Sequence, residues 1–213
     1  MASRRPQAAP SRLYLITPPI ADAGPFAASL GAALGAADVA AVLLRLAATE
    51  DQSRLEAIAA LAPVVQTKGV ALLLDGLPEL ARRAGADGAH LTGVGALGPA
   101  LAMLKPERIA GVGGLRTRHD AMIAGESGAD YVMFGEPDAG RPAAFATVVE
   151  RIAWWAQLFE PPCIGYAESF EEVAALAAAG ADFVALGDLV WAGDPGAVLK
   201  TAVEALRPAE ALP

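Results

Sequence analysis

A short segment, Ala-Gly-Ala-Asp followed directly by an apolar run, occurs at residues 84–87 and 179–182, and a close variant occupies residues 127–130. In each copy an alanine-rich helical stretch runs into a glycine, which accepts the left-handed conformation that ends a helix. These glycines are Gly85, Gly128 and Gly180. A buried strand is expected directly afterwards. The order helix, glycine stop, strand is typical of an α/β barrel, in which functional residues follow the C-terminal ends of the strands.

Eight apolar runs of strand length alternate along the chain with alanine- and leucine-rich segments of helical spacing. The runs lack polar alternation, which indicates strands buried on both faces and therefore a parallel sheet. No Gly-x-Gly-x-x-Gly fingerprint follows the first strand, which favours a closed barrel over an open dinucleotide fold. The fold class expected is α/β, a (β/α)₈ TIM barrel with a parallel eight-stranded barrel ringed by helices. Its strands are expected at Leu13–Thr17, Val39–Leu44, Val70–Leu74, Gly88–Leu91, Ile109–Val112, Tyr131–Phe134, Cys163–Gly165 and Phe183–Leu186.

Three expected helix starts carry residues that cap helices well: Thr117, Ser169 and Asp194, the last followed by proline at the first helical position. Trp154 and Trp155 are adjacent on one expected helix, so they cannot both face the barrel. One is expected in the core, and the other is a candidate for a self-association surface in a homodimer.

Composition narrows the class of protein. The 213 residues are 54% hydrophobic, enough to bury the core of one domain. The net charge of −8 comes with no basic stripe, so no nucleic-acid partner is expected. The single cysteine, Cys163, excludes an internal disulfide and fits a reducing cytoplasm, where we expect the protein. No stretch is long and apolar enough to cross a membrane, so no membrane partner is expected either.

The domain organisation is expected to be simple. Residues 1–12 contain no apolar segment and are interpreted as a disordered leader rather than a signal peptide. Residues 13–207 are expected to form a single TIM-barrel domain, and residues 208–213 a C-terminal tail.

Short motifs at the strand ends follow one another in a recognisable order. They are Tyr14-Leu-Ile-Thr, Val42-Leu-Leu-Arg45, Leu72-Leu-Leu-Asp75, Gly85-Ala-Asp-Gly-Ala-His-Leu91, Gly128-Ala-Asp-Tyr-Val-Met-Phe-Gly135, Ile164-Gly165, and Gly180-Ala-Asp-Phe-Val-Ala-Leu186 followed by Asp194-Pro195. In order and spacing they resemble the thiamine phosphate synthase family, which includes the thiazole tautomerases. The resemblance covers nearly the whole chain.

The resemblance implies a transferase reaction in thiamine biosynthesis on a TIM barrel. In the family, a Mg²⁺-bound hydroxymethylpyrimidine diphosphate loses its diphosphate, and the nitrogen of a thiazole phosphate captures the resulting carbocation. Charge builds up on the leaving diphosphate, so this chemistry requires cations and metal-binding carboxylates around it.

The metal and diphosphate motifs of the family are altered in this chain. The family's Gln-x-Arg-x-Lys after the second strand is Leu43-Leu-Arg45-Leu-Ala47 here, which keeps only the arginine. The Asn-Asp-Arg turn after the third strand aligns with Asp75-Gly-Leu77, and Gly-Gln-Glu-Asp after the fourth strand aligns with Thr92-Gly-Val-Gly95. Asp75 at most would remain for the metal, so Mg²⁺ is expected only if the family activity is retained.

The later motifs differ as well. Ser-x-His after the fifth strand aligns with Gly113-Gly-Leu115, and Glu136 replaces a proline after the sixth strand. Arg141 is the nearby cation for the family's diphosphate-binding lysine. Gly165-Tyr166 and Gly187-Asp188 replace the Gly-Gly and Val-Ser pairs that hold the thiazole phosphate on backbone N–H groups. Carboxylates at these positions repel phosphates, so both anion sites are expected to be impaired.

Three residues are candidates for catalysis: Arg45, Asp75 and His90. Arg45 either binds an anion or pairs with Asp75 or Glu136, because an unpaired buried guanidinium is costly. We expect Asp75 to be that partner, or a turn residue, rather than a lone Mg²⁺ ligand. A strand histidine such as His90 is more often a satisfied barrel residue than a catalytic base.

Residues that line the mouth are the candidates for substrate binding: Tyr14, Gly113, Gly135, Glu136, Arg141, Gly165, Tyr166, Gly187 and Asp188. An acidic mouth built from Glu136 and Asp188 would favour a cationic or a neutral polar ligand over a diphosphate.

Three functions follow from these residues. The first is a thiamine phosphate synthase-like protein whose activity is lost or altered. The second is a non-catalytic or regulatory barrel that binds a small molecule, for instance a thiamine-related heterocycle. The third is a different reaction on the same scaffold, built around Arg45, Glu136 and Asp188.

Overall fold

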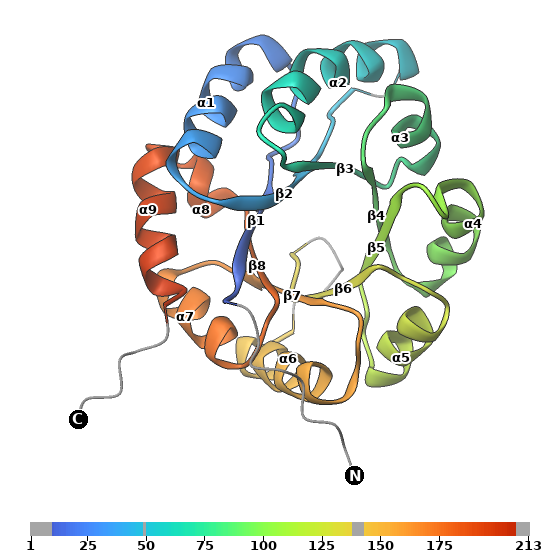
Figure 1. Ribbon diagram of the computed structural model, residues 1–213, viewed down its shortest axis with the longest axis vertical. Coiled ribbons are helices and arrows are strands. Elements are labelled where there is room, and N and C mark those ends of the chain that lie inside the picture. The colour runs from blue at the N-terminus through green and yellow to red at the C-terminus, as the bar shows by residue number, and fades with distance from the viewer. Residues whose placement is uncertain (1–9, 49, 138–142, 208–213) are drawn as a thin grey trace.

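Eight parallel strands close into a barrel in chain order, and helices surround it (Figure 1). The computed structural model describes residues 10–48, 50–137 and 143–207. The strands are β1 (Arg12–Ile16), β2 (Val39–Leu44), β3 (Ala71–Asp75), β4 (Gly88–Thr92), β5 (Ile109–Gly113), β6 (Tyr131–Phe134), β7 (Cys163–Ala167) and β8 (Phe183–Leu186). The helices are α1 (Ala23–Ala36), α2 (Asp51–Gln66), α3 (Pro78–Ala84), α4 (Val94–Leu104), α5 (Arg118–Glu126), α6 (Phe145–Leu158), α7 (Phe170–Ala178), α8 (Asp188–Trp191) and α9 (Pro195–Ala205).

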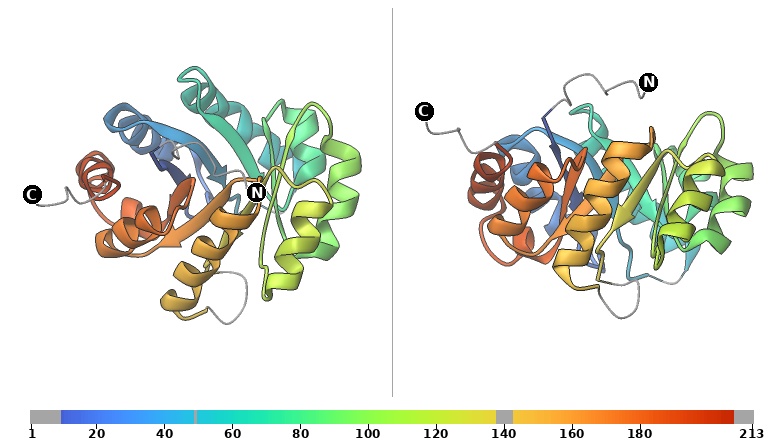
Figure 2. Two further views of the ribbon diagram at one scale, coloured as in Figure 1. Left: turned by 60° about the horizontal axis from the view of Figure 1, so that its bottom comes forward. Right: turned by 90° about the horizontal axis from the view of Figure 1, so that it is seen from below.

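The predicted TIM barrel is confirmed, and each predicted strand lies within two residues of an observed one at either end. The side views show the strands running together from one mouth of the barrel to the other, inside the helical ring (Figure 2). The boundary drawn at residue 12 needs a correction. Ser11 Oγ donates a hydrogen bond to the Ala181 carbonyl oxygen at 2.7 Å, and Arg12 opens β1. Both residues therefore belong to the barrel, while residues 1–9 and 208–213 lie outside the described residues.

The aspartates of the repeated segment perform one structural task. Oδ2 of Asp87 accepts the backbone N–H of Leu72, at the start of β3, at 2.7 Å. Asp130 and Asp182 accept in the same way from Ala110 of β5 and Cys163 of β7, at 2.6 and 2.8 Å. Each aspartate opens an even-numbered strand and satisfies a backbone donor of the strand before it. The repeat therefore sets the pairing of adjacent strands, which accounts for its aspartates without a catalytic role.

The predicted helix boundaries also hold. Thr117 and Ser169 accept backbone N–H groups of the first turns of α5 and α7, and Asp194 does the same for α9. Gly85 ends α3 with a φ of 70°, in the left-handed conformation that the repeated segment predicted.

Apolar side chains form two separate layers. The larger layer lies between the strands and the helices, and it contains Trp155, which is fully buried. Trp154, beside it, is half-buried and carries the Arg118 guanidinium 4.9 Å above its ring. The smaller layer fills the barrel interior and consists of Tyr14, Ile16, Ala41, Leu43, Leu73, Tyr131, Met133, Ile164, Tyr166 and Ala185. None of the helices in the described ranges has the length and apolar character needed to cross a membrane.

Candidate functional site

A small pocket of about 150 Å³ lies where the strands end. Its position matches that of the functional site in barrels of this class, at the C-terminal ends of the strands. Strand β1 and the turns after β2, β6 and β8 contribute its walls, together with β7. The lining residues are Ile16, Thr17, Arg45, Glu136, Pro137, Tyr166, Gly187 and Asp188. The pocket thus brings together four of the predicted site residues beside Arg45.

Arg45 leaves the end of β2 in a fixed position, because its backbone N–H donates to Oγ1 of the buried Thr17 at 3.0 Å. Its side chain forms an ion pair with Asp75 at the end of β3, with Nε 3.6 Å from Oδ2. This contact agrees with the expectation that Asp75 is the partner of Arg45. The positive charge of Arg45 is therefore partly offset before any anionic ligand arrives.

The carboxylate of Glu136 is directed toward β5 and is not wholly surrounded by solvent. Oε1 accepts the backbone N–H of Gly114. A Cβ atom added to Gly113 would lie 1.7 Å from that same oxygen and 2.9 Å from Nε2 of His90. Glycine at position 113 therefore leaves room for both the carboxylate and the imidazole.

His90 is a buried strand residue that faces the barrel interior. Its Nδ1 lies 2.9 Å from the hydroxyl oxygen of Tyr131, which in turn lies 3.0 Å from the hydroxyl oxygen of Tyr14. Burial lowers the pKa of His90 to about 4, so the imidazole is neutral at pH 7. Burial likewise raises the pKa values of both tyrosines above their usual range. The three side chains form one uncharged hydrogen-bonded chain across the barrel.

Sequence reasoning did not single out Tyr131, although it is a member of this chain. The sequence signal for Tyr131 is its place in the repeat, because this polar aromatic residue directly follows the aspartate of the variant segment at residues 127–130. Gly111 of β5 makes room for the ring, because a Cβ atom there would lie 1.9 Å from Cζ of Tyr131.

The last wall of the pocket comes from β7 and β8. Tyr166 is buried, and a Cβ atom added to Gly187 would lie 2.9 Å from its hydroxyl oxygen. Asp188 follows as the exposed first residue of the short helix α8. That helix is anchored to β1, because Nε1 of Trp191 donates to the Ile16 carbonyl oxygen at 2.7 Å.

Other predicted site residues lie elsewhere. Tyr14 lines the opposite end of the barrel interior, where the strands begin. Gly165 faces α7, because a Cβ atom there would lie 2.6 Å from the side chain of Leu176. Gly135 has a φ of 94° and abuts Val148 of α6, so it shapes the turn after β6. Arg141 lies outside the described residues.

The described residues do not fit a Mg²⁺ site. Mg²⁺ is held through carboxylates together with substrate phosphates. Asp75, the carboxylate left at the expected position, has its Oδ2 3.6 Å from the guanidinium of Arg45. The turn after β4, where the family carries its second carboxylate, is Thr92-Gly-Val-Gly95. Within the described ranges no three histidine, cysteine, aspartate or glutamate side chains come close enough to hold a metal ion together.

Comparison with known proteins agrees with the barrel fold. The family described as thiamine monophosphate synthase matches residues 13–190. A protein of Rhodospirillum centenum named thiamine-phosphate synthase is 42% identical over 184 residues, covering 84% of this chain and 89% of that protein. A protein of Hyphomonas neptunium with the same name is 38% identical, covering 87% and 88% of the two chains.

A solved structure has the same fold. The thiamine phosphate pyrophosphorylase from Pyrococcus furiosus superimposes with a TM-score of 0.77, covering 92% of this chain and 95% of that one at 18% identity. Together, the match over residues 13–190 and the two close relatives show that this chain belongs to the thiamine monophosphate synthase family.

Proposed function

We propose that this chain is a thiamine phosphate synthase-like protein whose synthase activity is lost or altered. The observation that supports the proposal is the charge of the pocket. Its described lining residues contribute one cation, Arg45, and two carboxylates, Glu136 and Asp188. The condensation requires the opposite balance, because negative charge accumulates on the departing diphosphate.

The pocket suits a different type of ligand. Its walls combine carboxylates with hydroxyl groups, and Asp75 partly offsets the Arg45 charge. Such a surface favours a neutral or cationic heterocycle over a diphosphate. A thiamine-related ring is the ligand class that fits both the family and this surface. The same charges support the second function, a barrel that binds such a ring without catalysing its conversion.

The experiment is a direct assay of the condensation. Purified protein is mixed with hydroxymethylpyrimidine diphosphate, thiazole phosphate and Mg²⁺, and thiamine phosphate is measured. The thiamine-phosphate synthase of Rhodospirillum centenum is assayed in parallel. We expect turnover to be absent, or at least about a thousandfold below that of the relative, since loss of a single stabilising contact costs about a hundredfold to a thousandfold. Turnover within about tenfold of the relative would contradict the proposal.

A paired titration tests the electrostatic argument itself. Asp188→Asn removes one carboxylate from the pocket, and Glu168→Gln removes one from an exposed position outside the pocket lining. We expect the first variant, and not the second, to bind inorganic phosphate more tightly than the parent chain. If the two variants behave alike, the repulsion assigned to the pocket is wrong. Thermal-shift titrations with thiamine phosphate and thiazole phosphate then test the ligand class, because a bound ligand raises the melting temperature.

A further inference from the structure

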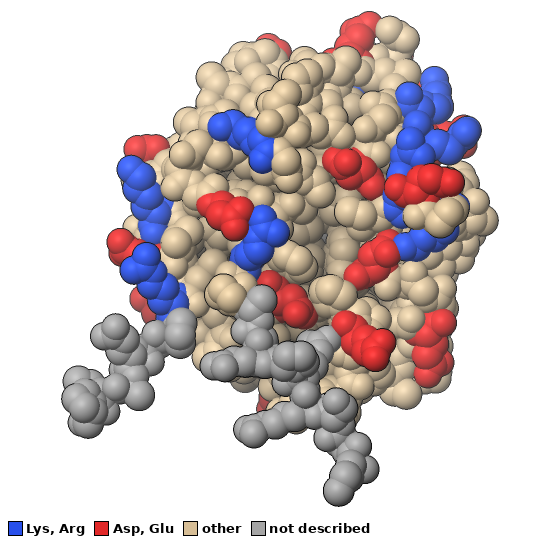
Figure 3. Space-filling view, in the orientation of Figure 1, with Lys and Arg blue, Asp and Glu red and all other residues tan. Residues whose placement is uncertain are grey.

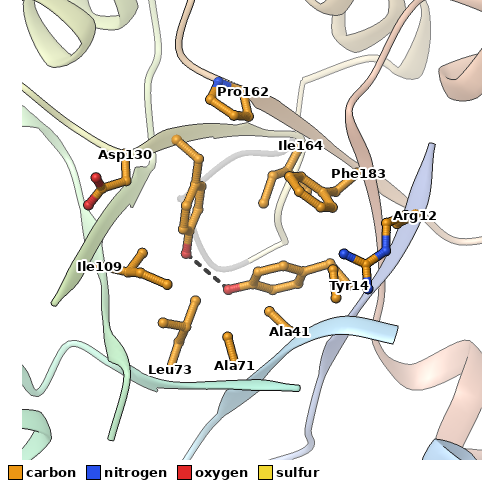
Figure 4. A pocket seen from close by; sticks show the side chains of 12 residues that line it. Arg12, Tyr14, Ala41, Ala71, Leu73, Ile109, Asp130, Pro162, Ile164 and Phe183 are labelled. Carbon is orange, nitrogen blue, oxygen red and sulfur yellow. Dashed lines mark hydrogen bonds between the residues drawn. The ribbon is translucent and has the colours of Figure 1, made fainter. Parts of the chain in front are cut away.

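A second cavity, of about 280 Å³, lies at the other mouth of the barrel, where the strands begin (Figure 4). We call it the N-terminal mouth cavity. Among the described residues, it shares no lining residue with the pocket at the C-terminal ends of the strands. Its lining residues are Arg12, Tyr14, Ala40, Ala41, Ala71, Leu73, Ile109, Asp130, Tyr131, Pro162, Ile164 and Phe183. Figure 3 views the molecule from this side and shows acidic and basic side chains close around an uncharged centre of the face.

The cavity exists because small side chains stand where large ones usually pack. In barrels of this class, layers of branched side chains fill the interior. Here β2 and β3 contribute Ala41 and Ala71 to the layer nearest this mouth. Tyr14 and Tyr131 reach across the barrel beyond them and meet through their hydroxyl groups, which closes the inner end (Figure 4). The described residues leave the remaining space unfilled.

The walls determine what could occupy this space. Leu73, Ile109, Ile164 and Phe183 are apolar, and together with the tyrosine rings they form the inner surface. The two charged residues of the rim are engaged with the protein. Arg12 donates two hydrogen bonds to Asp38, at 3.0 and 2.8 Å, and Asp130 accepts from the backbone of Ala110 and pairs with Lys105.

Water is a poor occupant of such a space, because a buried water molecule makes about three hydrogen bonds. The polar groups at the inner end are two tyrosine hydroxyls that already bond to each other. An apolar cavity of about 150 Å³ is known to hold benzene. A cavity of about 280 Å³ therefore has room for a substituted single ring, and three aromatic side chains are available to contact its faces and edges.

The hydrogen bond between the two tyrosines gives the ligand a polar requirement. The Tyr131 hydroxyl oxygen lies 2.9 Å from Nδ1 of His90 and 3.0 Å from the hydroxyl oxygen of Tyr14. In either direction of the Tyr14–Tyr131 hydrogen bond, the Tyr14 oxygen keeps a lone pair for a donor in the cavity.

We propose that the N-terminal mouth cavity binds a small, neutral aromatic molecule that donates one hydrogen bond to Tyr14. The bound ring lies at the far end of the chain of hydrogen bonds that reaches His90. Binding of the ring therefore changes the environment of His90, at the edge of the other pocket. This inference does not depend on the proposed function, because it uses neither the pocket at the C-terminal ends nor any synthase chemistry.

Phenol and toluene are the probes, since they have nearly the same shape and only phenol donates a hydrogen bond. Binding to the full chain is followed by calorimetry, and the imidazole resonances of His90 are followed by NMR. We expect saturable binding of phenol, tighter than that of toluene, with a shift of the His90 resonances. Ala71→Leu fills the cavity and should abolish binding of both probes, whereas Ala102→Leu, on an exposed position of α4, should leave binding unchanged.

Two further variants keep the test decisive. Ala41→Val narrows the same cavity from β2, and it replaces Ala71→Leu in the test if that variant does not fold. Tyr14→Phe should lower the ratio of phenol affinity to toluene affinity by about threefold to tenfold, the range expected for one hydrogen bond. Absence of saturable binding by folded parent protein, or equal binding by the cavity-filling variants, would overturn the site. An unchanged affinity ratio in Tyr14→Phe would overturn the assigned hydrogen bond.

Discussion

Nε of Arg45 and Oδ2 of Asp75 lie 3.6 Å apart at the ends of neighbouring strands, with 24% and 35% of the two side chains exposed. The pair gives the partly buried guanidinium of Arg45 a counter-charge within the protein. Solvent screens a pair of this exposure, so each charge weakens the other only modestly.

Removing the Asp75 charge should therefore favour anions. We expect Asp75→Asn to tighten the binding of inorganic pyrophosphate by about twofold to fivefold, because partly exposed ion pairs are worth up to about 1 kcal/mol. Arg45→Ala should abolish that binding. Calorimetric titration measures both, with Glu107→Gln, an exposed change before β5, as the control. Weaker binding by Asp75→Asn than by the parent chain would show that Asp75 itself helps to hold the anion.

The repeated aspartates should contribute to the stability of the fold and not to activity. Asp182→Ala leaves the buried backbone N–H of Cys163 without its acceptor, which is expected to cost about 1–3 kcal/mol in the free energy of unfolding. Chemical denaturation measures the change. Glu204→Ala, an exposed substitution on α9, should cost little. Equal free energies for the two variants would remove the structural role assigned to the repeat.

His90 should make the protein less stable in mild acid. The unfolded chain takes up a proton on this imidazole near pH 6.5, whereas the folded chain does so only near pH 4. Between these values the unfolded state binds the extra proton, so the free energy of unfolding falls as the pH falls, by up to about 3 kcal/mol. Denaturation curves from pH 7.5 to 4 measure this slope. His90→Gln should flatten it, while His119→Gln, at an exposed position, should leave it unchanged.

The adjacent tryptophans should differ strongly in their contribution to stability. Trp155 is fully buried, and its Nε1 donates to the Pro161 carbonyl oxygen at 2.7 Å, so Trp155→Ala is expected to cost about 3–5 kcal/mol. Trp154→Ala removes a half-buried ring and should cost less. Thermal denaturation compares the two variants directly. The homodimer expected from Trp154 stays a prediction, which sedimentation of the parent chain and of Trp154→Ala would test.

The strands and helices were largely predictable because each rests on neighbouring residues. Apolar runs without polar alternation are typical of strands buried on both faces, and capping residues such as Thr117 and Ser169 act within their own first turns. The repeat was recognised from the sequence, but the backbone N–H groups that its aspartates bind were not. Those partners, Leu72, Ala110 and Cys163, belong to the preceding strands, between 15 and 20 residues away.

The candidate site was predictable only in part. The sequence left open whether Arg45 binds an anion, pairs with Asp75 or pairs with Glu136, and it offered no means to choose among them. Tyr14 was expected at the substrate site because its motif matches the family, yet it lines the other mouth of the barrel. Residues of a strand alternate between inside and outside, but their depth along the barrel depends on how all eight strands are staggered.

The sequence by itself determined the closed barrel, its strand order and the family, since these depend on local periodicity and on motifs in a fixed order. Tertiary structure alone decided which charges meet, where His90 finds its partners and that a cavity remains beneath two tyrosines. The physical reason is that ion pairs, buried hydrogen bonds and unfilled volume are relations between residues far apart in the chain, and they are fixed only when the eighth strand closes on the first.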